Sequence, residues 1–238
     1  MEYKRYEALL LDMDGTFLDF EASQKQAFIK AMGCHGYPAG EKEYGLYCRI
    51  NHGLWEAFER GEIDKPTLLS TRFVRLFDAL GIEGDGAAFE EEYQSLLGTG
   101  HDLMEDAWEV LEQLSAKYAL YVVTNGVEST QRNRLRLSGI ERFMTGIFIS
   151  ETIGYQKPQK EFFDYCFSHI KEDRGGLIII GDSLTSDIQG GINAGIDTCW
   201  FNPAGERRPA GWLRKNGAFR PGFRDLEIRK LRELMELL

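Results

Sequence analysis

The sequence has few of the features that define disulfide-rich, zinc-binding, secreted or membrane proteins. Its four cysteines are scattered without CxxC spacing, so neither a disulfide framework nor a zinc site is indicated. No apolar run approaches a membrane span in length, and the run near the N-terminus is too short for a signal peptide. We therefore expect a cytoplasmic protein with reduced thiols.

The chain also lacks an excess of positive charge. It contains 28 lysines and arginines against 38 aspartates and glutamates, a formal net charge of −10. Nucleic-acid polymers and anionic membranes bind basic surfaces, so we expect neither as a partner. A small phosphorylated substrate is compatible with this charge, because one cation and a few local hydrogen-bond donors can override the global field.

A short apolar run that ends in two carboxylates stands out near the N-terminus. Residues 8–11 indicate a strand buried on both faces, and Asp12, Met13, Asp14 and Gly15 follow it. Ligands of parallel sheets bind beyond the carboxyl ends of the strands, which places both carboxylates at a site. A DxDG segment alone is also typical of an ordinary acidic turn, so residues elsewhere in the chain are needed to distinguish a functional site from a turn.

The stretch after this segment has a helical pattern throughout. Amphipathic helices are expected at residues 21–33, 40–60, 64–81 and 86–97, and no strand-like alternation interrupts them. The pattern predicts an all-helical domain over residues 18–98, inserted into a core domain formed by residues 1–17 and 99–238.

From about residue 101 the predicted strands and helices alternate. Strands are expected at 119–123, 146–150, 177–180 and 197–201, and helices at 105–117, 129–138, 159–170 and 186–194. Such alternation predicts an α/β fold with a Rossmann-like parallel sheet and helices on both faces. The tail, residues 225–238, is predicted to be one amphipathic helix.

Polar residues suited to one reaction follow several of these strands. The predicted site gathers carboxylates with a lysine, a hydroxyl and an amide: Asp12, Asp14, Thr124, Asn125, Lys157, Asp182 and Asp187. Clustered carboxylates without clustered histidine or cysteine indicate Mg²⁺, and the lysine and polar donors indicate a phosphate. The set favours phosphoryl transfer, with one carboxylate as nucleophile and another as general acid and base.

The segments DMDGT, TNG, the lysine of YQKPQKEFF and GDSLTSD resemble, in this order, the four motifs of the haloacid dehalogenase-like (HAD) hydrolases. The resemblance spans the whole chain, including a helical cap directly after the first motif. It implies that Asp12 is the nucleophile and forms an aspartyl-phosphate. It also implies that Asp14 protonates the leaving group and later activates water.

The same resemblance implies roles for the remaining motif residues. Thr124 and Asn125 would hold phosphoryl oxygens, and Lys157 would neutralise the nucleophile and the phosphate. Mg²⁺ would be bound by Asp12, Asp182 and the backbone carbonyl of Asp14, and Asp187 would complete the acidic cluster. Asp187 could instead cap the helix that follows it.

The presence of Asp14 separates branches of this family. Dehalogenases lack an acid at this position, because a halide leaves without a proton, so ester hydrolysis is favoured here. The sugar-phosphate mutases keep both aspartates and stay open as an alternative. The stretches INHGLWEAFERGEIDKPTLLSTRF and DIQGGINAGIDTCWFNP look like the branch that hydrolyses pyrimidine nucleoside monophosphates.

The hypothesis is therefore a Mg²⁺-dependent phosphatase for small phosphate monoesters, with a pyrimidine nucleoside 5′-monophosphate as the favoured substrate. Asn51 and Trp55, four residues apart on one predicted helix, could hydrogen-bond and stack on a base, or could belong to the cap core. Phosphoglycolate and sugar phosphates are alternative substrates. A receiver-like module that binds Mg²⁺ and phosphate without turnover is the non-enzyme alternative, although it would need no helical insertion.

Overall fold

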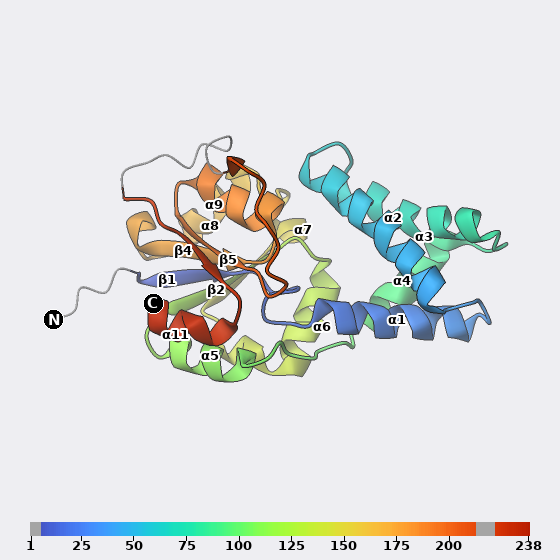
Figure 1. Ribbon diagram of the computed structural model, residues 1–238, viewed down its shortest axis with the longest axis horizontal. Helices are drawn as coiled ribbons and strands as arrows, with labels where there is room; N and C mark the ends of the chain where they lie inside the picture. Colours follow the sequence, from blue (N-terminus) through green and yellow to red (C-terminus); the bar gives the residue numbers. More distant parts are fainter. Residues whose placement is uncertain (1–5, 213–221) are drawn as a thin grey trace. The chain divides into compact units, whose positions relative to one another are not determined.

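A computed structural model describes residues 6–212 and 222–238, and the chain divides into two compact units (Figure 1). The core unit contains the chain up to Asp19, Leu103–Glu128, and Ser138 onward; the helical unit contains Phe20–Asp102 and Ser129–Leu137. The sequence pattern places residues 129–137 in the core, whereas their contacts group them with the helical unit.

The core unit is built on a parallel sheet. Among the described residues the sheet has six strands in the order β3-β2-β1-β4-β5-β6: β1 Ala8–Leu11, β2 Ala119–Thr124, β3 Gly146–Ile149, β4 Leu177–Gly181, β5 Asp197–Phe201 and β6 Asp225–Ile228. Leu11 at the end of β1 pairs with Val122 and with Ile180. Strands β1, β2 and β4 therefore end within two residues of one another, which brings the residues that follow them to one edge.

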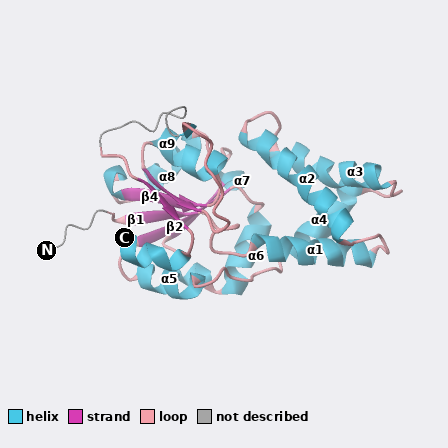
Figure 2. Ribbon diagram, viewed as in Figure 1, coloured by secondary structure: helices cyan, strands magenta, loops and turns pink. Residues whose placement is uncertain are grey.

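Helices cover both faces of this sheet, as the predicted α/β fold requires (Figures 1 and 2). Leu10 and Ile179 point to one face and pack with Phe163 in a buried apolar cluster. Helices α8 (Lys160–His169) and α9 (Gln189–Ala194) lie on one side of the sheet, and α5 (Ala107–Ser115) and α11 (Leu234–Leu237) lie on the other. None of the helices in the described ranges has the length and apolarity needed to cross a membrane.

The prediction of one helix over the C-terminal tail is wrong. Residues Asp225–Ile228 form β6, which pairs in parallel with β5 so that Thr198 lies opposite Asp225. A 3₁₀ turn and the short α11 follow it. The free edge of β5 supplies backbone partners to β6, and this long-range pairing overrides the local helical pattern.

The helical unit contains the four predicted helices: α1 Phe20–Cys34, α2 Glu41–Glu59, α3 Lys65–Leu80 and α4 Gly86–Leu97. Asp64 caps α3 by accepting a hydrogen bond from the Thr67 N–H at 2.9 Å. Aromatic rings dominate the interior of the unit; the Phe73 ring centroid lies 4.7 Å from that of Phe89 and 4.9 Å from that of Tyr93. The predicted all-helical composition of this region is therefore confirmed.

Candidate active site

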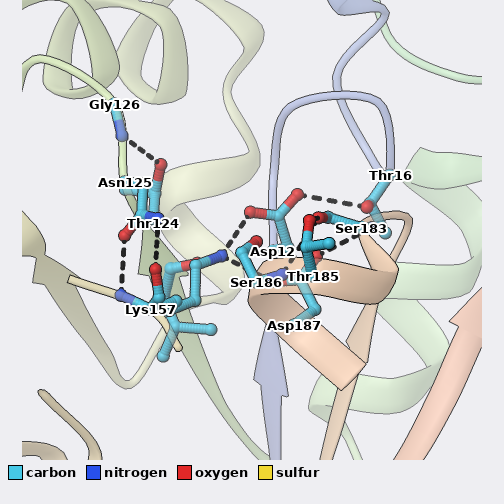
Figure 3. Close-up of polar contacts among 11 residues, drawn as sticks. Asp12, Thr16, Thr124, Asn125, Gly126, Lys157, Ser183, Thr185, Ser186 and Asp187 are labelled. Atoms are coloured by element: carbon cyan, nitrogen blue, oxygen red, sulfur yellow. Dashed lines mark hydrogen bonds and ion pairs between the residues drawn. The ribbon is translucent and has the colours of Figure 1, made fainter. Parts of the chain in front are cut away.

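Three carboxylates converge at the carboxyl edge of the core sheet. Asp12 follows β1, and Asp182 and Asp187 follow β4. Each offers an oxygen, and these oxygens all lie within 4.8 Å of one another. Figure 3 shows Asp12 and Asp187 with the polar residues around them. The sequence prediction that these acids share one site is thus consistent with the geometry.

Lys157 lies between two of these carboxylates. Its Nζ donates to Asp12 Oδ1 and to Asp187 Oδ1, both at 2.7 Å, and to the Val123 carbonyl at 2.8 Å. An ammonium group has three N–H donors, so these acceptors use all of them. Burial alone lowers the pKa of Lys157, but the charges of Asp12 and Asp187 outweigh it and raise the pKa above the usual value. Lys157 is therefore a charged, fixed group.

The Asp12 carboxylate is buried and held at both oxygens. Its Oδ2 accepts a hydrogen bond from Thr16 Oγ1 at 3.2 Å, and its Oδ1 accepts from Lys157 (Figure 3). Burial raises the pKa of Asp12 to about 7; the Lys157 charge opposes this shift and the Asp187 charge adds to it. A bound cation would therefore stabilise the negative charge of the Asp12 carboxylate.

A bound cation would also stabilise the Asp182 carboxylate. Although part of the residue is exposed, the protein atoms packed around its carboxyl group raise the pKa of Asp182 well above its usual range. The charges of Asp12 and Asp187 add to this shift. Clustered carboxylate oxygens without soft ligands match the donors that Mg²⁺ prefers, so the residues present fit this ion.

Asp187 is fully buried, and both of its oxygens have partners. Oδ1 accepts from Lys157, while Oδ2 accepts from the Ser183 N–H at 3.1 Å. Gly181 permits this approach, because a Cβ at that position would lie 2.2 Å from Asp187 Oδ2. Ser183, and not Asp187, supplies the side chain that caps the following π-helical turn, through the Ser186 N–H.

Asn125 fixes the segment that carries Lys157. The Asn125 Oδ1 accepts from the Lys157 backbone N–H, and its Nδ2 donates to the Lys157 carbonyl, both at 2.9 Å (Figure 3). Thr124 Oγ1 accepts from the Gly126 N–H at 3.1 Å. The predicted phosphate-binding residues thus lie together at the ends of β2 and of the loop after β3, and Asn125 has an anchoring role that its sequence context did not indicate.

Asp14 and Gly15 form the turn after β1. Asp14 is half-buried, and Gly15 has a φ of +80° in the left-handed region that favours glycine. A Cβ on Gly15 would lie 2.6 Å from Asp182 Oδ2. Because residue 15 is a glycine, the turn that follows Asp12 and Asp14 can lie close to the Asp182 carboxylate.

The two cap candidates lie on α2 in the helical unit. Asn51 is buried; its Nδ2 donates to Gln24 Oε1 at 3.1 Å, and its Oδ1 accepts from Arg72 at 3.0 Å. Trp55 is half-buried, and its ring packs edge-on against Phe58 with centroids 5.6 Å apart. Both side chains thus have structural contacts within their own unit.

Two residues that contact the predicted site, Thr16 and Trp200, were not predicted as site residues. Thr16 donates its hydroxyl to Asp12, and its position at the end of the DMDGT segment was the available signal. Trp200 donates its indole N–H to the Asp182 carbonyl at 2.8 Å. No local pattern could reveal this second contact, because it depends on how β5 pairs with β4.

Comparison with known proteins agrees with this arrangement. A family model described as haloacid dehalogenase-like hydrolase matches residues 6–195. The HAD-hydrolase YfnB of Bacillus subtilis (strain 168) is 41% identical over 240 residues, which cover 99% of this chain and 96% of YfnB. A crystal structure of YfnB bound to magnesium has a TM-score of 0.89 and 42% identity, covering 99% of each chain.

Two further relatives have names that specify a substrate class. The pyrimidine 5′-nucleotidase PynA of Streptococcus pneumoniae (strain ATCC BAA-255 / R6) is 38% identical over 83% of this chain and 84% of PynA. The pyrimidine 5′-nucleotidase YjjG of Escherichia coli (strain K12) is 30% identical over 87% of this chain and 91% of YjjG. With the order of its motifs, its fold and these matches in agreement, the chain belongs to the haloacid dehalogenase-like hydrolase family.

Proposed function

We propose that this hydrolase is a Mg²⁺-dependent phosphatase that acts through an aspartyl-phosphate on pyrimidine nucleoside 5′-monophosphates. The observation that carries the proposal is the fixed position of Lys157 between Asp12 and Asp187, beside a third carboxylate. A buried cation next to a carboxylate cluster suits the binding of a phosphoryl group and a divalent ion together.

The proposed metal site consists of Asp12, Asp182 and the backbone carbonyl of Asp14, with Asp187 completing the acidic cluster. When bound, Mg²⁺ would neutralise negative charge on the phosphoryl oxygens and on the attacking carboxylate. Lys157 places a positive charge at the same carboxylate, through its bond to Asp12 Oδ1. Thr124 and Asn125 lie beside Lys157 and are the proposed partners of the remaining phosphoryl oxygens.

The proposed reaction has two steps. An Asp12 carboxylate oxygen attacks phosphorus, the bond from phosphorus to the ester oxygen breaks, and Asp14 transfers its proton to the leaving oxygen. A water molecule then attacks the aspartyl-phosphate while Asp14 takes a proton from it. The bond from phosphorus to Asp12 breaks, so inorganic phosphate leaves and Asp12 returns to its starting form.

The preference for pyrimidine nucleotides is supported by the names of two relatives, PynA and YjjG, and by the cap sequence. Trp55 is the proposed cap residue for the base. Asn51 is buried and its amide is bonded to Gln24 and Arg72, so its proposed part is to hold the helix that carries Trp55. Trp55→Leu would remove the aromatic ring, with Trp108→Leu in the core unit as the matched control. If Trp55 stacks on the base, kcat/KM for dUMP falls about tenfold relative to an aryl phosphate, whereas the control leaves this ratio unchanged.

The test is phosphate release from a panel of monoesters, with Mg²⁺ or with chelator. The panel contains an aryl phosphate, dUMP, UMP, dTMP, AMP, phosphoglycolate and hexose phosphates. Chelator-sensitive release led by pyrimidine nucleotides supports the proposal. Release led by another ester would refute the nucleotide preference, and interconversion of hexose phosphates without release would identify a mutase. Absence of release from every ester would favour the receiver-like module.

A further inference from the structure

We infer that Trp200 is a positioning residue for the metal ligand Asp182 and thereby sets the affinity of the site for Mg²⁺. The indole Nε1–H of Trp200 donates to the main-chain carbonyl of Asp182 at 2.8 Å. The inference rests on the metal site of the proposed function. The four motifs assign a role to the Asp182 side chain, whereas this inference concerns the residue that holds the Asp182 main chain.

The register of the sheet explains why Trp200 reaches this carbonyl. Gly181, the last residue of β4, pairs with Trp200 of β5. Asp182 comes directly after this last pair, where the chain leaves the sheet and the backbone ladder ends. A main-chain carbonyl at such a point needs another donor, and the indole N–H supplies it. The indole N–H therefore bonds the first carbonyl beyond the last backbone pair of β4 and β5, and this carbonyl belongs to the proposed metal ligand Asp182.

Trp200 is itself held firmly. It is only 3% exposed, and the Arg208 guanidinium carbon lies 5.1 Å from the centroid of its ring. Arg208 forms an ion pair with Asp225 at the start of β6. Asp225 also accepts a hydrogen bond from Thr198 Oγ1 at 2.6 Å. A continuous set of contacts thus runs from the edge strand through Arg208 and Trp200 to Asp182.

Asp182 is consequently confined from two directions. Trp200 holds its main chain, and the Gly15 turn lies so close that a Cβ there would meet its carboxylate at 2.6 Å. With the peptide fixed, the carboxylate keeps its orientation toward Asp12 and Asp187. Residues that orient a metal ligand typically contribute about 10- to 100-fold to metal affinity. For one neutral hydrogen bond to the main chain we expect the lower value, about tenfold.

The test measures Mg²⁺ binding to the full chain by titration calorimetry, without substrate. Trp200→Phe removes the N–H donor and keeps an aromatic ring on the strand. Phe201→Leu is the matched control, because Phe201 is the next residue and equally buried but carries no donor. We expect the Mg²⁺ dissociation constant to rise about tenfold in Trp200→Phe and to stay within about twofold in Phe201→Leu.

Kinetics separate positioning from general loss of structure. In Trp200→Phe, kcat for an aryl phosphate should recover at high Mg²⁺, and KM for this substrate at saturating Mg²⁺ should match the wild type. Equal Mg²⁺ affinity in Trp200→Phe and the wild type would overturn the inference and leave the proposed function intact. A wild-type protein that binds no Mg²⁺ would overturn the metal site itself, and this inference with it.

A second variant applies if Trp200→Phe fails to fold. Arg208→Lys keeps the positive charge near Asp225 but removes the planar group that lies over the indole ring. We expect about threefold weaker Mg²⁺ binding, in the same direction as for Trp200→Phe. Unchanged affinity in a folded Arg208→Lys protein would contradict the inferred set of contacts.

Discussion

Replacing Lys157 with methionine should destabilise the core unit in a pH-dependent way. The Lys157 side chain is 1% exposed, and its ammonium is bonded to Asp12, Asp187 and the Val123 carbonyl. Methionine has a similar length, but it leaves two buried carboxylates without their cation. Removing one partner of a buried ion pair typically costs about 3–5 kcal/mol. We expect a loss of that size near pH 8.5 in the presence of chelator.

The pH dependence follows from the sign of the Asp12 shift. The pKa of Asp12 is already raised from 3.8 to about 7 in the folded protein, and loss of the Lys157 charge raises it further. An acid with a raised folded pKa destabilises the fold above its unfolded pKa, and the loss grows until the pH passes the folded pKa. Near pH 5 Asp12 is protonated, so its share of the loss shrinks to that of a lost hydrogen bond, about 1 kcal/mol, and the total loss is smaller than at pH 8.5.

The assay is urea unfolding followed by tryptophan fluorescence in a Trp55→Phe background. The other three tryptophans, Trp108, Trp200 and Trp212, belong to the core unit, so the signal reports that unit alone. Lys160→Met is the matched control, because Lys160 pairs with Asp164 on the protein surface, and it should cost about 0.5 kcal/mol at most. A loss in the Lys157 variant that is independent of pH, or as small as in the control, would show that Lys157 does not neutralise the buried carboxylates.

Three further predictions concern the same site. Asp12→Asn should keep the fold, as measured by circular dichroism, and lose more than a hundredfold in kcat; near-normal turnover would exclude Asp12 as nucleophile. Gly15→Ala should weaken Mg²⁺ binding in calorimetry, since its Cβ would lie 2.6 Å from Asp182, whereas Gly154→Ala, at a similar φ with nothing within 4 Å, should change stability only. Because Asp12 has a pKa of about 7, it is increasingly protonated as the pH falls below that value, so Mg²⁺ affinity should fall between about pH 8.5 and 6. Mg²⁺ binding near pH 7 should then release a proton, which calorimetry in buffers of different ionisation enthalpy measures. A Mg²⁺ affinity independent of pH would contradict this prediction.

The parts of the molecule that could be predicted from sequence are those with local signals. The apolar runs at residues 8–11 and 177–180 are short, continuous and followed by polar residues, which is typical of strands in a parallel sheet. These two strands end within one residue of each other, and the carboxyl ends of parallel strands lie at one edge, so Asp12 and Asp182 come together. The helices of the cap were equally predictable from their period and their breaks.

The parts that could not be predicted depend on pairing between distant segments. The residues of Asp225–Ile228 fit an amphipathic helix and also alternate between polar and apolar, as in a strand. Pairing with the edge of β5 stabilises the strand. The Trp200 bond to Asp182 depends on a register that no local pattern specifies. The two hydrogen bonds between Asn125 and the Lys157 main chain likewise join residues 32 positions apart.

The proposed function depends on an aspartyl-phosphate at Asp12, and trapping this intermediate tests the function directly. Excess protein would be mixed with an aryl phosphate labelled at phosphorus, in the presence of Mg²⁺, and quenched in acid within a single turnover. We predict label bound to the protein, mapped to Asp12 and absent from the Asp12→Asn variant. Release of labelled phosphate with no label on the protein at any time, or label on another residue, would contradict it.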